Sequence, residues 1–253
     1  MKLLIDIGNT RLKSALWDGG QLRHGPMLAH AATGEAGAPA AAEFWALWKD
    51  IPAPEEIWVA SVAASALEHE LIGSLAARFA ATPRFVRSPA TACGVRNAYS
   101  APARLGIDRF LGLVAAHAQV AGAAVVAGCG TALTLDAIDG EGRHLGGLIA
   151  PAPGLMRSAL LERAARLGDL GAAAVVDFAD TTAAAVESGT WLAVVALVER
   201  FVAKTQARLG TAPALFVCGG GGKRLAALLD SAHRFEPDLV LRGLAVFADG
   251  AHA

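Results

Sequence analysis

The sequence opens with Lys2-Leu3-Leu4-Ile5-Asp6-Ile7-Gly8-Asn9-Thr10, and apolar and polar residues then alternate through Leu12–Trp17. Alternation with a period of two is typical of a strand that buries one face, and a short turn containing Gly-Asn typically joins two antiparallel strands. The stretch therefore predicts a strand, a tight turn at residues 8–10 and a second strand.

The same pattern returns near the middle of the chain, at Val125-Val126-Ala127-Gly128-Cys129-Gly130-Thr131-Ala132-Leu133-Thr134-Leu135-Asp136. Placing Gly8 on Gly130 gives an offset close to half of the 253 residues. Because a repeat of this length indicates a duplicated design, we expect two similar domains, residues 1–118 and 119–253.

Each copy of the repeat places a turn of small residues between two buried strands. Such a turn offers exposed backbone N–H groups and a threonine hydroxyl, and these groups bind anionic oxygens well. One Gly-Asn turn would be weak evidence, since such turns occur in many ordinary hairpins. Two copies half a chain apart favour hairpins that face each other across a cleft, with a polyphosphate between them.

The segments between and after the hairpins show helical and strand-like spacing, which is typical of an α/β protein. We expect helices over residues 40–48, 67–79, 110–120, 156–167, 182–209 and 223–229, and strands over 57–60, 84–86 and 215–217. Residues 31–42, rich in Ala, Gly and Pro, predict a loop.

Composition excludes several classes of protein. The chain is 54% hydrophobic and 18% charged with a net charge of −1, which excludes a disordered chain and a strongly basic nucleic-acid-binding face.

Asp6 comes too early for the apolar segment of a signal peptide. The longest apolar region, 111–127, is interrupted by His117 and Gln119 and falls short of the about 20 residues of a membrane span. We expect a cytoplasmic protein with no nucleic-acid or membrane partner, whose three cysteines are reduced core thiols.

Three segments outside the turns could carry chemistry. Asp6 directly follows a strand, so its carboxylate can assist a phosphate-bound Mg²⁺ or accept hydrogen bonds from the turn. The Gly219–Gly222 run follows an apolar strand and favours either a nucleoside or phosphate surface or a flexible loop, but Val217 and Arg224 do not fit a Walker A motif.

The third segment surrounds the single tyrosine of the chain, Tyr99. It continues to Asp108 and Arg109, just before an apolar helical stretch. An acid and an arginine at a helix start suit a carboxylated substrate with a hydroxyl group to be deprotonated, whereas the simpler interpretation is that Asp108 caps the helix.

Five segments occur in the order seen in type III pantothenate kinases, namely Asp6–Lys13, Gly106–Arg109, Gly130–Asp136, Gly146–Pro151 and Thr182–Gly189. The chain thus resembles this family over nearly its whole length. The Gly-Asp-Arg element combined with the first hairpin is specific to the family, while the hairpins alone indicate the wider superfamily of acetate and sugar kinases, Hsp70 and actin.

The resemblance implies a duplicated ribonuclease H-like (actin-like ATPase) fold with two similar domains flanking a nucleotide cleft, usually in a homodimer. It also implies transfer of the γ-phosphoryl group of ATP to pantothenate, the first step of coenzyme A synthesis, with Mg²⁺ and a monovalent cation, K⁺ or NH₄⁺. Other superfamily kinases and a non-catalytic ATP-binding regulatory protein are the alternatives.

The resemblance also assigns residues. Asp108 corresponds to the general base, and Asp6 assists Mg²⁺. The ATP-binding positions are Asp6, Ile7, Gly8, Asn9, Thr10, Arg11, Leu12 and Lys13, together with Thr131. The pantothenate-binding positions are Tyr99, Gly106, Ile107, Asp108, Arg109 and Thr182.

The sequence departs from the family pattern at two places. Gly128 stands where the family usually has an aspartate associated with the monovalent cation, so we expect the potassium requirement to be weakened or met by other groups. Residues 151–154, Pro-Ala-Pro-Gly, are slightly longer than the usual proline-glycine turn and predict an altered loop.

Overall fold

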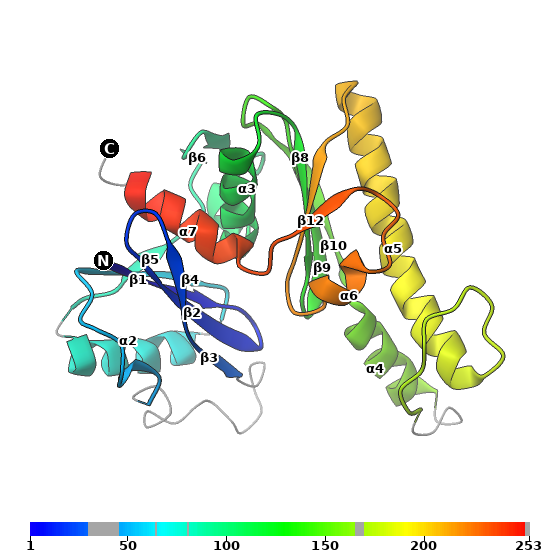
Figure 1. Ribbon diagram of the computed structural model, residues 1–253, viewed down its shortest axis with the longest axis horizontal. Helices are drawn as coiled ribbons and strands as arrows, with labels where there is room; N and C mark the ends of the chain where they lie inside the picture. Colours follow the sequence, from blue (N-terminus) through cyan, green and yellow to red (C-terminus); the bar gives the residue numbers. More distant parts are fainter. Residues whose placement is uncertain (30–45, 64, 80, 165–169, 251–253) are drawn as a thin grey trace. The chain divides into compact units, whose positions relative to one another are not determined.

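The computed structural model describes residues 1–29, 46–63, 65–79, 81–164 and 170–250 (Figure 1). These residues form two units. The first contains residues 1–119 together with the C-terminal residues from Asp238 onward, and the second contains residues 120–237. The predicted loop over 31–42 and most of the predicted helix over 40–48 lie outside the described residues.

The first unit is built on a five-stranded sheet. Its order is β3 (Leu22–Ala29), β2 (Arg11–Trp17), β1 (Lys2–Ile7), β4 (Glu56–Ser61) and β5 (Arg84–Val86). Strand β1 is antiparallel to β2 and parallel to β4, and helix α2 (Ser65–Phe79) connects β4 to β5. The predicted strand, turn and strand at the N-terminus are therefore confirmed.

The second unit repeats this sheet. Its order is β10 (His144–Pro151), β9 (Ala132–Ile138), β8 (Ala124–Cys129), β11 (Ala214–Cys218) and β12 (His233–Phe235). Strand β8 is antiparallel to β9 and parallel to β11, so it takes the place that β1 has in the first unit. The duplication inferred from the hairpin repeat is confirmed, and the fold is a duplicated ribonuclease H-like fold.

The other elements are mostly helices. They are α3 (Ile107–Gln119), α4 (Pro153–Arg163), α5 (Thr182–Leu209), α6 (Gly222–Ala226) and α7 (Leu239–Gly250), a 3-10 turn η1 (Pro102–Arg104), and a small sheet of β6 (Thr91–Ala92) and β7 (Val95–Arg96). Residues 151–154, for which an altered loop is predicted, join β10 to α4. Pro151 ends β10, and Pro153 starts α4 at a position where the missing N–H group of proline costs nothing.

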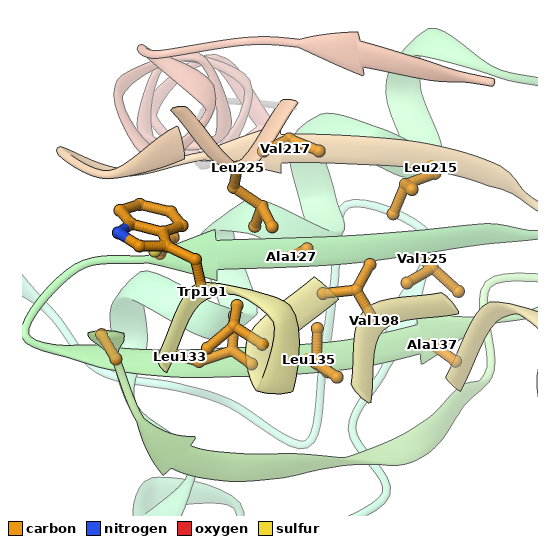
Figure 2. Packing of buried hydrophobic residues seen from close by; sticks show 13 residues of the cluster. Val125, Ala127, Leu133, Leu135, Ala137, Trp191, Val198, Leu215, Val217 and Leu225 are labelled. Carbon is orange, nitrogen blue, oxygen red and sulfur yellow. The ribbon is translucent and has the colours of Figure 1, made fainter. Parts of the chain in front are cut away.

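Alternating apolar residues build a core in each unit. Figure 2 shows α5 lying over the second sheet, with Trp191 and Val198 against Leu133 and Leu135 of β9. Each large aliphatic side chain buried in this way contributes about 1.5–3 kcal/mol relative to exposure. Helix α5 is also long and apolar enough to cross a membrane by length and composition, but core helices of soluble proteins pass the same test.

Helix α5 has the bounds predicted from the sequence because both of its ends are capped. The Thr181 hydroxyl accepts a hydrogen bond from the Ala184 N–H group, and Gly210 ends the helix in a left-handed conformation. All three cysteines are free, as expected, with Cys129 and Cys218 buried.

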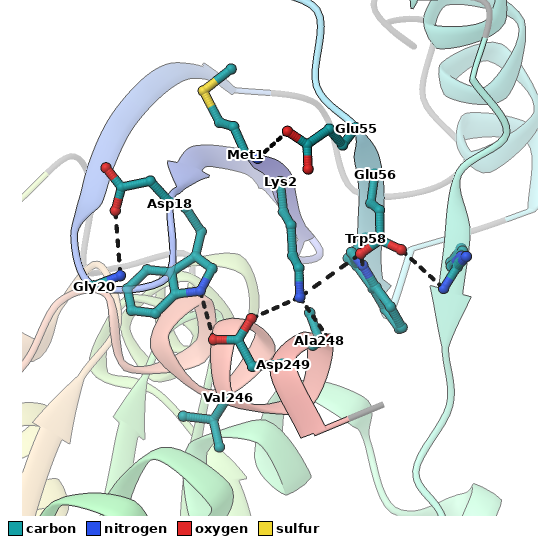
Figure 3. Close-up of polar contacts among 12 residues, drawn as sticks. Met1, Lys2, Asp18, Gly20, Glu55, Glu56, Trp58, Val246, Ala248 and Asp249 are labelled. Atoms are coloured by element: carbon teal, nitrogen blue, oxygen red, sulfur yellow. Dashed lines mark hydrogen bonds and ion pairs between the residues drawn. The ribbon is translucent and has the colours of Figure 1, made fainter. Parts of the chain in front are cut away.

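The chain's last helix corrects the predicted domain division, because α7 belongs to the first unit. Lys2 Nζ donates to Asp249 Oδ1 at 2.7 Å and to the Ala248 carbonyl at 2.8 Å (Figure 3). Trp17 Nε1 donates to Asp249 Oδ2 at 2.8 Å. A side chain at Gly243 would collide with the Leu111 carbonyl, so glycine allows α7 to lie close against α3. The second unit is thus inserted into the first.

Candidate nucleotide and substrate site

The tip of the β1–β2 hairpin exposes its backbone to solvent. The Gly8 N–H group donates to the Arg11 carbonyl at 3.0 Å, and Asn9 and Thr10 are exposed at the tip. The side chains of Ile7 and Leu12 are fully buried in the first core. Of the predicted ATP-binding stretch, these two residues can therefore offer a ligand only their backbone.

Asp6 is half-buried beside this tip and lies opposite Lys13 in the strand pairing. Loss of hydration and, next in size, the negative charge of Asp108 raise the pKa of Asp6 to about 7, while the positive charge of Lys13 opposes the shift. The hydrogen bond of the Gly8 N–H group goes to the Arg11 carbonyl and not to Asp6. The structure therefore brings together two carboxylates, Asp6 and Asp108, that are far apart in the sequence.

This pair of carboxylates fits a divalent cation that arrives with phosphate. Mg²⁺ usually takes one or two carboxylates and completes its shell with water and phosphate oxygens. Within the described residues no group of three or more His, Cys, Asp or Glu side chains could form a closed metal cage. Asp6 is thus suited to assist a phosphate-bound Mg²⁺.

Asp108 is the second residue of α3, so it lies inside the first helical turn. The Phe110 N–H group donates to the Gly106 carbonyl at 3.1 Å, which puts Gly106, and not Asp108, at the N-cap position. A Cβ atom at Gly106 would come within 2.6 Å of Asp108 Oδ1. Glycine at 106 therefore leaves space for the half-buried carboxylate.

Arg109 and Tyr99 contact each other next to Asp108. Arg109 is buried, its Nη1 donates to the Tyr99 hydroxyl at 3.1 Å, and its Cζ atom lies 5.8 Å from the centre of the tyrosine ring. Ile107 is buried, so its side chain faces the core. Among the predicted substrate positions, the side chains of Asp108, Arg109 and Tyr99 form one group in the first unit.

Asn97 holds the loop that carries Tyr99, a role that sequence reasoning missed. Its side-chain amide donates to the Pro89 and Pro102 carbonyls at 3.2 and 3.1 Å, and its Oδ1 accepts from the Tyr99 N–H group at 3.0 Å. The sequence signal for this role was an asparagine in a loop between Pro89 and Pro102, because asparagine side chains commonly form hydrogen bonds with nearby backbone groups.

In the second unit, the tip of the β8–β9 hairpin packs against the glycine run. Gly130 and Thr131 are exposed at this tip. The Gly221 N–H group donates to the Cys129 carbonyl at 2.9 Å, and a Cβ atom at Gly221 would lie 2.8 Å from Cys129 Sγ. The second hairpin tip and residues 219–222 therefore form one surface.

Gly128 has little room for a side chain. A Cβ atom there would lie 2.7 Å from Thr134 Oγ1 and 3.7 Å from Cys218 Sγ. An aspartate at this position would have to displace the Thr134 hydroxyl, which holds the space beside the strand.

Thr182 belongs to the second unit, whereas Asp108, Arg109 and Tyr99 belong to the first. It is the exposed first residue of α5, directly after the capping residue Thr181.

Comparisons with known proteins decide the family. A family model described as type III pantothenate kinase matches residues 2–204. The chain belongs to the type III pantothenate kinase family. A type III pantothenate kinase from Stenotrophomonas maltophilia (strain R551-3) is 42% identical over 245 residues, which cover 97% of this chain and 96% of that protein. One from Xanthomonas campestris pv. campestris (strain B100) is also 42% identical, with the same coverage.

Solved structures show the same fold. A Campylobacter jejuni protein assigned to the Baf family of transcriptional activators is 21% identical, with a TM-score of 0.61 and coverage of 99% of this chain and 100% of that chain. A Sinorhizobium meliloti protein assigned as a 2-dehydro-3-deoxygalactonokinase is 17% identical, with a TM-score of 0.57 and coverage of 100% and 98%. At these identities the likeness concerns the fold alone.

The raised pKa of Asp6 predicts how the pantothenate kinase's stability changes with pH. Because the folded-state pKa of about 7 exceeds the ordinary 3.8, folding favours the protonated form, and this contribution to stability is lost as the pH rises from about 4 to 7. Asparagine at position 6 stays neutral at both pH values. The melting temperature of Asp6→Asn minus that of wild type should therefore be larger at pH 8 than at pH 5, by about 4 °C or more.

Thermal unfolding monitored by circular dichroism at both pH values measures this difference. Asp18→Asn is the control, because backbone hydrogen bonds lower the pKa of Asp18 and its substitution should give no gain at pH 8. An Asp6→Asn difference that is the same at both pH values would contradict the prediction.

Proposed function

We propose that this protein transfers the γ-phosphoryl group of ATP to the primary hydroxyl of pantothenate, the first step of coenzyme A synthesis. Family membership over nearly the whole chain supports the reaction. The observation that carries it on this chain is the placement of Asp108, at the start of α3, close to Asp6 and next to the buried Arg109.

In the proposed mechanism, Asp108 accepts the proton of the pantothenate hydroxyl while the oxygen attacks the γ-phosphorus and ADP leaves. Arg109 binds the pantothenate carboxylate, and Tyr99 and the exposed Thr182 complete the substrate contacts. Because phosphoryl transfer depends mainly on position and charge, a carboxylate base near the hydroxyl suffices. Mg²⁺ bound with ATP supplies charge neutralisation for the phosphates.

The two hairpin tips are proposed to bind one polyphosphate. The first tip offers the exposed residues 9–11 and the nearby Lys13, and the second offers Thr131. Backbone N–H groups in such turns suit phosphate oxygens. The glycine run beside the second tip is proposed to approach the nucleoside, since residues without side chains allow close contact.

The function is tested by ADP release with pantothenate, glucose or acetate as acceptor. We expect pantothenate alone to support turnover, and Asp108→Asn to lower kcat by about 100-fold or more, the usual contribution of a general base. Its melting temperature should stay close to that of wild type, since Asp108 is not the N-cap residue. Asp18→Asn, in an exposed turn, is the control and should keep full activity.

Other outcomes of the same assay separate the alternatives. Turnover with glucose or acetate but not pantothenate would indicate another small-molecule kinase. ADP release that does not depend on any acceptor would indicate an ATP-binding regulatory protein.

We also propose that activity depends only weakly on K⁺ or NH₄⁺. Gly128 offers no carboxylate, and the Thr134 hydroxyl holds the space that a side chain would need. Initial rates in sodium, potassium and ammonium buffers of equal ionic strength should agree within about twofold, less than the factor that one charged ligand usually contributes. Activity that vanishes in sodium and returns with potassium would disprove this.

We further propose that the enzyme is cytoplasmic and that it forms a homodimer through the second unit. Six of the nine large apolar side chains exposed among the described residues lie on β10, on α4 and in the loop before α5. They are Leu148, Ile149, Leu155, Leu160, Val176 and Phe178. Exposed apolar side chains gathered on neighbouring elements are typical of an interaction surface.

Sedimentation velocity tests the dimer. We expect the wild type to sediment as a dimer and the double variant Ile149→Glu/Phe178→Glu as a monomer, because each charge would be buried in the interface. Ile72→Glu, an exposed position on α2 in the other unit, should remain dimeric. A monomeric wild type, or a double variant that stays dimeric, would contradict the proposal.

A further inference from the structure

Glu187, in the second turn of α5, contacts side chains from three helices of the second unit. Its Oε1 atom accepts from Trp191 Nε1 at 3.2 Å and lies 2.6 Å from Arg224 Nη1 of α6. Its Oε2 atom lies 3.8 Å from Arg157 Nε of α4. The Glu187 side chain is only 13% exposed, so this carboxylate is largely shielded from water and committed to these partners.

The partners of Glu187 are themselves stacked. The Arg224 guanidinium carbon lies 4.7 Å from the centre of the Trp191 ring, within the range of a cation–π interaction. One carboxylate oxygen thus sets the orientation of both the indole and the guanidinium. Charge-assisted hydrogen bonds of this kind are short and directional.

Trp191 is also a wall of the glycine run. A Cβ atom at Gly221 would lie 3.6 Å from Trp191 Cη2, so the indole is in van der Waals range of the turn. The turn is also held by the hydrogen bond from the Gly221 N–H group to the Cys129 carbonyl at the second hairpin tip. Gly221 therefore contacts both Trp191 and the tip, and Arg224 lies two residues after the glycine run, in α6.

A run of four glycines needs such external support. Glycine has the largest conformational freedom of any residue, and a surface that binds a ligand does so more tightly when it is already in the bound conformation. The short helix α6, Gly222–Ala226, begins at this run and has no side-chain cap at its N-terminus.

We propose that Glu187 is a positioning residue for nucleotide binding. By holding Trp191 and Arg224, it fixes the Gly219–Gly222 turn against the second hairpin tip. The inference rests on the proposed function in that the turn receives the nucleoside of ATP. Glu187 takes no part in the transfer step, so its loss weakens nucleotide binding and leaves the chemistry at Asp108 intact.

A purely structural ion pair is the competing explanation. The Arg224 side chain is 44% exposed, and ion pairs with an exposed partner contribute little to the free energy of unfolding. A substitution at Glu187 should therefore leave the protein folded. This separates an effect on binding from an effect on stability.

The test compares Glu187→Gln with wild type by calorimetric titration with a non-hydrolysable ATP analogue and Mg²⁺. The amide keeps the shape of the side chain and an acceptor for Trp191 but removes the charge that orients Arg224. We expect Kd for the analogue and KM for ATP to rise about 5- to 20-fold, in the range of one charge-assisted contact. The kcat value and KM for pantothenate should stay within about twofold of wild type.

Glu199→Gln is a matched control on the same helix. Glu199 also accepts backbone hydrogen bonds, from Asp230 and Ser231 at 3.1 and 3.0 Å, and lies about 18 Å further along α5. Glu199→Gln removes the same charge at a position far from the glycine run, so binding of the analogue should not change. Equal losses in the two variants would overturn the proposal.

A double-mutant cycle tests whether Glu187 acts through Arg224. We expect Glu187→Gln, Arg224→Gln and the double variant to weaken analogue binding to a similar extent, because each breaks the same contact. The proposal would be overturned if the loss of affinity in the double variant equalled the product of the two single losses. It would also be overturned if Glu187→Gln bound the analogue as tightly as wild type. Since titration needs no phosphoryl transfer, a wild type that binds the analogue but does not phosphorylate pantothenate would refute the proposed function alone.

Discussion

The whole structure depends on a conflict between burial and exposure at the ends of two strands. Strands β1 and β8 are buried in the middle of their sheets, yet each ends in a turn with exposed residues, as the proposed binding of phosphate requires. Small residues at the two tips resolve the conflict, because they let the chain reverse without side chains covering its N–H groups. The flanking strands and helices secure each turn from behind, and the charged residues of the site are placed relative to it.

Local patterns predicted the parts of the fold that are determined locally. The strand alternation of the two hairpins and their spacing along the chain were sufficient for the duplication, and the threonine and glycine caps were sufficient for the bounds of α5. The membership of α7 in the first unit could not be predicted in the same way. It depends on the packing of α7 against α3 and on the contacts of Asp249 with Lys2 and Trp17, all of which join distant parts of the chain and show no pattern in the sequence.

The candidate site shows the same limit. Motif spacing identified Asp6, Asp108 and Arg109, but not the closeness of the first two, which arises only when α3 packs beside the first sheet. The motif also grouped residues by position without regard to side-chain direction. Ile7, Leu12 and Ile107 turn into the core because alternate strand residues and the inner helix face must be buried. Asn97 and Glu187 act through partners that no short motif contains.

The return of α7 to the first unit also bears on synthesis. A ribosome releases β1 and β2 first, but these strands lack their partner α7 until residues 239–250 have emerged. The inserted second unit is then completely translated while the first still waits for its final helix, which reverses the usual N-terminal-first order of domain folding. During that interval the face of α3 against which α7 packs has not yet received this partner.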